Sequence, residues 1–236
     1  MTTYPLYLDA LTQPHLLIAG ATGSGKSVII NALITTAIAK PPRDIPGGIG
    51  LILIDPKRVE LSIYRRLPHT LRYASEPDVM LNALQYAMTL CDSRYKRMQR
   101  RGERLYNGSD VYIVIDEFAD LMTTQGKIIK PIIQRLAQIG RAARVHIILA
   151  TQTPIAKVLP TEIKCNFDAR FALRTRSAQD SRNITGFPGC EQLPRYGQAY
   201  YITPESTKRV NVPMFPDSVI SDAIKHWSLR RLIFAA

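Results

Sequence analysis

Short, continuously apolar runs alternate along the chain with longer segments in which apolar residues recur at helical spacing. The runs are typical of strands that are buried on both faces, and the longer segments are typical of helices that cover such a sheet. This alternation predicts an α/β fold with a mainly parallel central sheet flanked by helices. Strands are expected at His15–Ala19, Gly50–Ile54, Val111–Ile115, Val145–Ala150, Ala169–Leu173 and Gln198–Ile202. Helices are expected at Lys26–Ala39, Pro77–Arg100, Lys127–Ile139, Ala178–Ile184 and Asp217–Leu229.

The helix expected over Pro77–Arg100 combines two kinds of surface. Its later turns are basic, which is typical either of a solvated helix face or of a surface that meets a polyanion. An apolar stripe on the same helix consists of Val79, Ala83, Tyr86, Ala87 and Leu90. The basic residues are Arg94, Lys96, Arg97, Arg100 and Arg101.

Length and charge narrow the class of protein. The 236 residues suit one α/β domain with a sizeable core and are few for two, so we expect a single domain over residues 1–236. Lysine and arginine number 31 against 19 acidic residues, which gives a net charge of +12. Such a balance indicates a polyanionic partner, such as nucleic acid, nucleotide phosphates or an anionic membrane surface, or else a general charge for solubility.

Cysteine usage and hydropathy bear on the compartment. Cys91, Cys165 and Cys190 show no CxxC spacing, and the four histidines form no metal pattern, which fits a reducing environment. No apolar run approaches the ~18–20 residues needed to span a bilayer, and the N-terminus lacks a signal pattern. We expect a cytoplasmic protein that meets a membrane only through segments outside this chain.

A phosphate-binding loop follows the first expected strand. The pattern GxxxxGK[ST] lies between an apolar strand and a helix, which is the context that supports this motif. The glycines let successive backbone N–H groups point at phosphate oxygens, and the helix adds the positive end of its dipole. Lys26 is expected to reach the β- and γ-phosphates, and Ser27 to offer its hydroxyl to Mg²⁺. The expected nucleotide-binding residues are Gly20, Ala21, Thr22, Gly23, Ser24, Gly25, Lys26 and Ser27.

Two acids end the strand expected at Val111–Ile115. Asp116 fits the residue that holds Mg²⁺ through its water shell, and Glu117 fits the base that orients or deprotonates the attacking water. A strand ending in a solvated acid is common, but adjacent acids together with a phosphate loop indicate an ATPase that hydrolyses its nucleotide. ATP and Mg²⁺ are therefore the expected cofactors.

Polar residues also end the strand expected at Val145–Ala150. If this strand lies beside the phosphate-loop strand, Gln152 could contact the γ-phosphate or the lytic water. The alternative is that Gln152 only caps the end of its strand. We expect a RecA-like sheet in which the Gln152 strand lies between the phosphate-loop strand and the Asp116 strand.

Together these strings resemble the motor domain of the FtsK/SpoIIIE family of DNA translocases. The resemblance covers about residues 14–215, with a helix at about 216–230 after it, and several strings are more specific than the phosphate loop alone. The matching strings are Pro14–Ser27, Leu53–Lys57 with Glu60–Ser62, Ile115–Met122, Arg141–Ala143 with His146, Ala150–Gln152, Asp180–Arg182, and Glu191–Leu193 followed by Gly197.

The resemblance implies a RecA-like ATPase that forms a hexameric ring around double-stranded DNA, with nucleotide between subunits, as in chromosome segregation. It also implies that Arg141 is the arginine that completes a neighbour's site and stabilises charge on the transferring phosphoryl group. Arg144 and Arg182 are the next candidates. A surface salt bridge is the alternative role for each of the three.

Several features depart from the family pattern. Only 19 residues precede Gly20, so we expect the membrane region, linker and N-terminal motor subdomain to be missing, as in a truncated or minimal relative. The segment between Arg101 and Val111 is short, Arg144 replaces a small residue, and Thr153-Pro154 replaces Arg-Pro. No winged-helix region is expected, which puts sequence-guided direction along DNA in doubt.

DNA contacts in a ring motor should be electrostatic and weakly dependent on sequence. The segment from Thr153 to Asn166 follows the Gln152 strand and is our first candidate for a pore loop, through Lys157 and Lys164. The basic run Arg94–Arg104 is the second candidate.

Two other functions remain open at this stage. A related ring ATPase of a conjugation or secretion system would move another substrate, and its ATPase would respond to that substrate instead of to DNA. A nucleotide-gated assembly module would turn over little ATP, and Glu117 speaks against that function.

Overall fold

A computed structural model describes residues 13–45, 47–212 and 216–234, with the side chains of the last helix described as far as Trp227. Eight strands form one sheet in the order β3-β2-β4-β5-β1-β6-β7-β8. The strands from β3 to β6 in this order are parallel, and β7 and β8 add antiparallel pairs at one edge. The strands are β1 His15–Ala19, β2 Ile49–Ile54, β3 Thr70–Ala74, β4 Asp110–Ile115, β5 Val145–Thr151, β6 Ala169–Ala172, β7 Gln198–Ile202 and β8 Thr207–Asn211.

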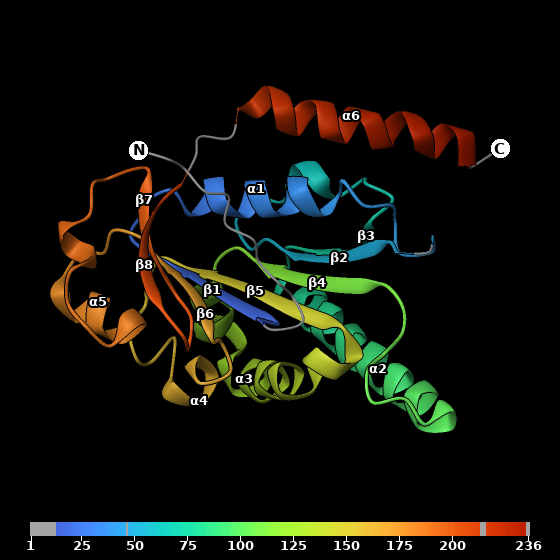
Figure 1. Ribbon diagram of the computed structural model, residues 1–236, viewed down its shortest axis with the longest axis horizontal. Coiled ribbons are helices and arrows are strands. Elements are labelled where there is room, and N and C mark those ends of the chain that lie inside the picture. Colours follow the sequence, from blue (N-terminus) through green and yellow to red (C-terminus); the bar gives the residue numbers. More distant parts are fainter. Residues whose placement is uncertain (1–12, 46, 213–215, 235–236) are drawn as a thin grey trace.

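Helices cover both faces of the sheet and complete a three-layer arrangement (Figure 1). One face packs against α1 and α6, and the other packs against α2 and α3, so two apolar cores lie on either side of the strands. The helices are α1 Lys26–Ala37, α2 Pro77–Arg101, α3 Phe118–Ala143, α4 Thr161–Lys164, α5 Ala178–Thr185 and α6 Asp217–Phe234, with short 3₁₀ turns η1 Ser62–Tyr64 and η2 Cys190–Gln192. No helix within the described ranges is long and apolar enough to span a bilayer.

The fold confirms the α/β prediction and the expected strand order. Every strand predicted from an apolar run is present. The prediction succeeded because β1, β2, β4 and β5 are buried along their whole length, and a strand covered on both faces has an apolar sequence throughout. The β5 strand lies between β1 and β4, as the sequence led us to expect.

Two strands were not predicted. Both β3 and β8 lie at the edges of the sheet, where one side of a strand has no strand partner. Their sequences, TLRYA and TKRVN, mix polar and charged residues with few apolar ones, and the residues of β8 are mostly exposed. Charged edge strands discourage unwanted pairing with other chains, but they remove the apolar signal on which the prediction depended.

The α3 helix begins at Phe118 instead of the predicted Lys127 and ends at Ala143 instead of Ile139. The early start was missed because Gln125 breaks the helical geometry, with φ −136° and ψ 26°, and Gly126 and Pro131 follow it. The helix begins directly after Glu117, whose side chain accepts a hydrogen bond from the Ala119 amide at 3.4 Å. Because of this early start, the second acid of β4 also caps a helix.

The apolar stripe predicted on α2 is partly wrong. Val79 is 45% exposed, whereas Ala83 and Ala87 are buried as predicted. The buried face also includes Arg94, which is only 3% exposed. Its Nη1 donates to the carbonyl oxygens of Ala143 at 2.6 Å and Arg144 at 3.0 Å, so it supplies a donor to the acceptors at the C-terminus of α3. The basic turns of α2 are therefore not simply a solvated face.

Candidate nucleotide site

Polar residues gather where the parallel strands end. The carboxyl ends of parallel strands together form one edge of a sheet, which differs from the outer edges formed by β3 and β8. The ligands of α/β proteins usually bind at this edge of strand ends. The phosphate loop follows β1, Asp55 follows β2, Asp116 and Glu117 follow β4, and Gln152 follows β5. The α1 helix begins at this edge and runs across one face of the sheet (Figure 1).

The phosphate loop depends on glycine for its shape. Gly23 has φ +70° and Gly25 has φ +104°, which are left-handed conformations that side chains disfavour. A Cβ on Gly20 would lie 2.8 Å from both Leu173 Cβ and Ser24 Oγ, so that position has no room for a side chain. Gly25 caps α1, and the helix starts at Lys26 with its free N–H groups facing the loop.

Lys26 lies in the centre of this loop. Its Nζ donates to the carbonyl oxygens of Gly20 at 2.8 Å and Ala21 at 3.0 Å. Burial lowers the pKa of Lys26 to about 8, although Glu117 and Asp116 pull the pKa upward. A buried ammonium that is held mainly by neutral carbonyls would gain from anionic oxygens, so the loop suits the phosphates of a nucleotide.

Three donors from two segments of the chain fix the Glu117 side chain. Its Oε1 accepts from Thr151 Oγ1 at 2.9 Å and from the Gln152 amide at 3.1 Å, and its Oε2 lies 3.4 Å from Lys57 Nζ. The side chain is 3% exposed. The carboxylate therefore has one orientation beside the phosphate loop, as a base that positions water would require.

Asp116 lies near several other acidic side chains. Burial is the largest of the effects that raise the pKa of the Asp116 carboxyl to about 6; nearby Glu60, Asp55 and Glu117 contribute in the same direction, and Lys57 opposes them. A divalent cation would relieve this repulsion. The described residues contain no group of three or more histidine, cysteine or acidic side chains that could hold a metal by themselves. The donor set of Ser27 and Asp116 thus fits Mg²⁺ that takes its remaining ligands from nucleotide and water.

Gln152 contacts the phosphate loop, whereas its predicted contact with the γ-phosphate or the lytic water stays a prediction. Its Oε1 accepts a hydrogen bond from Thr22 Oγ1 at 2.6 Å. The same residue donates its backbone N–H to Glu117. One residue therefore joins the loop that would hold the phosphates to the carboxylate that would position water.

Two basic residues near the site carried no role in the sequence analysis. Lys57 pairs with Glu117, and it belongs to the Leu53–Lys57 string that carried the family resemblance. Arg195 places its Nη2 3.7 Å from where a Cβ of Gly23 would lie, and its guanidinium is 5.3 Å from the Tyr196 ring. An arginine between Pro194 and Gly197 matches no general motif, so only the fold brings it to the phosphate loop.

The candidate arginines for action in trans are placed very differently. Arg141 is exposed near the C-terminus of α3, just before β5 begins, and therefore lies at the opposite edge of the sheet from the phosphate loop. Arg144 donates from Nε and Nη2 to the two oxygens of Asp110 at 2.8 and 2.7 Å. Arg182 is exposed on α5. Arg144 thus forms an ion pair within its own subunit, which makes it the weakest of the three candidates for the arginine that acts in trans.

The two lysines proposed for DNA also differ. Lys157 is exposed in the segment that follows β5. The Nζ of Lys164 donates to the carbonyl oxygen of Asn183 at 2.8 Å, and burial lowers the pKa of Lys164. Lys164 therefore joins α4 to α5, and Lys157 is the better candidate for an external anion.

Comparison with known families gives a match over most of the chain. The family model described as FtsK/SpoIIIE family matches residues 1–112 and 103–156. A protein named DNA translocase FtsK from Bradyrhizobium diazoefficiens is 35% identical over 266 residues, which cover 94% of this chain and 32% of the relative. One of the same name from Pseudomonas syringae pv. tomato is 34% identical over 96% of this chain. The chain thus spans about a third of the length of these curated relatives.

Solved structures support the fold. The conjugation coupling protein TcpA of pCW3, described as a monomer form with ATPgS, superposes with a TM-score of 0.80 at 22% identity, covering 92% of this chain and 66% of TcpA. Two ATPase domains of EssC from Geobacillus thermodenitrificans give a TM-score of 0.79 at 12% identity, covering 95% of this chain and 45% of that one. The chain therefore shares its fold with these two proteins.

Proposed function

The chain belongs to the FtsK/SpoIIIE family, and from this premise we propose that it is a single motor domain that hydrolyses ATP at the subunit interfaces of a ring, as a homohexamer, to pump double-stranded DNA. One observation carries the proposal: the phosphate loop, Asp116, Glu117 and Gln152 meet at one edge of the sheet, while Arg141 is exposed at the opposite edge. A site so divided is completed when the Arg141 edge of one subunit meets the nucleotide edge of the next.

Nucleotide binding requires the phosphate loop to hold the β- and γ-phosphates. Backbone N–H groups from Gly23 to Ser27 provide the cradle, and the Lys26 ammonium exchanges its carbonyl partners for phosphate oxygens. Ser27 and Asp116 would hold Mg²⁺, which neutralises charge on the phosphates.

Water attack is assigned to Glu117. Its carboxylate is held by Thr151 and the Gln152 amide, so it can orient a water without searching for its own position. Arg141 of the neighbouring subunit would stabilise charge on the transferring phosphoryl group. Gln152 contacts both the phosphate loop, through Thr22, and Glu117, so it is placed to respond to loss of the γ-phosphate.

Coupling to DNA follows from chain connectivity. Gln152 is followed directly by the segment that carries the exposed Lys157. A shift of Gln152 after hydrolysis would move this segment, which we assign as the DNA-contacting loop. Its contacts would be to backbone phosphates, so binding should weaken steeply with salt.

The proposal is tested by steady-state ATPase activity with and without long duplex DNA at two salt concentrations, on the parent chain and on Lys26→Ala. We expect DNA to raise the parent's rate about tenfold or more at low salt, the gain to shrink at high salt, and Lys26→Ala to be inactive in all conditions. Hydrolysis that depends on Lys26 but ignores DNA would contradict DNA translocation and favour a conjugation or secretion motor with another substrate.

Arg195 gives a prediction about nucleotide affinity. Its guanidinium lies beside Gly23 of the phosphate loop, so a bound nucleotide phosphate is its expected partner. Arg195→Ala should raise KM for ATP about tenfold, with kcat within about threefold of the parent, because a charged hydrogen bond contributes about 1.5–3 kcal/mol. Arg209→Ala is the matched control, since that exposed arginine pairs with Gln198 on β7 and β8. Equal KM values for both variants would contradict a role in nucleotide binding.

A further inference from the structure

A polar cavity lies away from the nucleotide site. Its volume is about 350 Å³, and it lies between α2, the turn after α1 and the segment that joins α2 to β4. Pockets of this size accommodate small ligands. The residues that line it are Arg43, Asp44, Leu90, Ser93, Arg94, Arg97, Tyr106 and Ser109.

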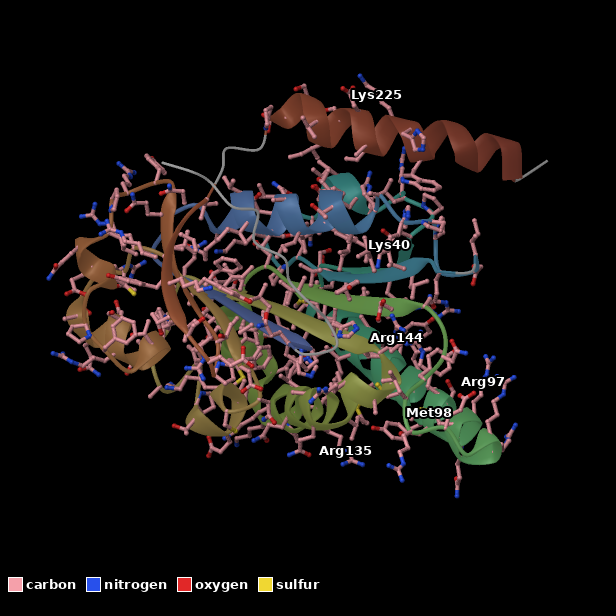
Figure 2. All side chains as sticks on the ribbon, in the orientation of Figure 1. Lys40, Arg97, Met98, Arg135, Arg144 and Lys225 are labelled. Atoms are coloured by element: carbon pink, nitrogen blue, oxygen red, sulfur yellow. The ribbon has the colours of Figure 1, made fainter. Side chains whose placement is uncertain are left out.

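Three arginines converge on this cavity, which we name the arginine pocket. Ser93, Arg94 and Arg97 share one face of α2, since positions three and four apart are neighbours on a helix. Arg43 enters from the turn after α1. Asp44 is the one carboxylate in the lining, and its Oδ1 lies 3.7 Å from Arg43 Nε. Its side chain is 89% exposed, and three arginines against one carboxylate leave the lining positively charged. Figure 2 shows Arg97 on the outer part of α2.

Arg94 is the buried base of the arginine pocket. Its Nη1 serves the C-terminus of α3, but its Nε is buried and has no hydrogen-bond partner within the described part of the chain. Burial lowers the pKa of Arg94, and repulsion from Arg43 lowers it further. Capping of α3 therefore explains one nitrogen of this side chain and leaves the buried Nε donor unexplained.

The rim of the pocket supplies further donors. Arg94 and Arg97 lie 4.4 and 5.6 Å from the centre of the Tyr106 ring, which holds both guanidinium groups against one wall. Ser93 and Ser109 add hydroxyl groups to the lining. Planar guanidinium forks with hydroxyl donors match a tetrahedral oxyanion, and arginine is the residue that best recognises phosphate in this way.

We propose that the arginine pocket binds a phosphate group, with Arg43, Arg94 and Arg97 as its charged ligands. The group comes either from the backbone of DNA or from a free phosphate compound, since both present the same oxygens. This site is separate from the phosphate loop, which lies at the other edge of the sheet, and it does not depend on the proposed motor function.

The test measures the rise in Tm that inorganic phosphate causes, relative to chloride at equal ionic strength. Every protein carries Lys26→Ala, which weakens phosphate binding at the phosphate loop. The pocket variant is Arg43→Ala with Arg97→Ala. Its control is Arg100→Ala with Arg104→Ala, which removes the same charge from exposed positions outside the lining. Arg94 is left intact because it supports α3.

We expect the control to gain about 3–6 °C in Tm at a phosphate concentration about ten times Kd, and the pocket variant to gain less than about 1 °C. Equal gains in the two proteins, or no gain in the control, would overturn the proposal. Matching Tm values in chloride exclude a folding defect as the cause.

A second arm identifies the source of the phosphate. Duplex DNA binding is followed by fluorescence anisotropy across a salt series. If DNA supplies the group, the pocket variant loses about tenfold more affinity than the control, and its salt dependence falls by about one unit of slope. Equal losses in both variants, with phosphate stabilisation still confined to the control, assign the pocket to a free phosphate compound.

Discussion

Glu117→Gln should lower kcat for ATP hydrolysis by about 10²–10⁴-fold, the range expected when a general base is removed. Glutamine preserves the size of the side chain, and its carbonyl oxygen can still accept from Thr151 Oγ1 and the Gln152 amide. The change therefore removes the negative charge and the pairing with Lys57, but it leaves the surrounding geometry in place. Binding of ATP should change by less than about threefold, because this interaction belongs to the transition state.

Single-turnover hydrolysis and equilibrium binding of a fluorescent ATP analogue separate the two effects for Glu117→Gln. Glu60→Gln is the matched control: its charge also raises the pKa of Asp116, but Glu60 is not held at the end of β4. We expect Glu60→Gln to keep at least about a third of the parent's rate. Similar losses in both variants would mean that the site needs negative charge in general and not a positioned base at Glu117.

The elements that hold the nucleotide site could be predicted because two strong signals coincide there. A doubly covered strand must be apolar, so β1, β4 and β5 stand out in the sequence. The phosphate loop must contain glycines, because Gly23 and Gly25 adopt left-handed conformations and Gly20 has no space for a Cβ. Backbone geometry and burial therefore restrict the residue types at these positions, and the restriction is visible in the sequence.

The contacts between segments far apart in the chain could not be predicted, because they do not restrict the residue types in this way. In the sequence, Arg94 is one of several basic residues on a predicted helix. Only the packing of α2 against α3 reveals that it is buried and caps α3. Arg195 lies beside Gly23, more than a hundred positions away in the chain. Lys164 looks like a free surface charge until its bond to Asn183 is seen. Long side chains can bury their stems and choose partners that local sequence does not specify.

Arg141→Ala should lower kcat by about 10³–10⁵-fold, the usual effect of removing an arginine that acts on the transferring phosphoryl group. The defect should have an unusual property: it should be rescued by a second inactive protein. Lys26→Ala subunits lack a working phosphate loop but still present Arg141 to their neighbours. Arg141→Ala subunits have the opposite defect, so one kind of mixed interface contains every required residue.

Mixing the two inactive proteins therefore tests the division of the site between subunits. In an equal, random mixture, about one interface in four pairs an intact phosphate loop with an intact Arg141, and ATPase activity should rise toward a quarter of the parent's. Arg135→Ala, an exposed change on the same helix (Figure 2), should be active alone and show no such dependence on a partner. No recovery in mixtures that light scattering shows to be assembled would exclude Arg141 as the residue in trans. Recovery would establish that each ATP is hydrolysed between two subunits, because neither inactive chain contains a complete site.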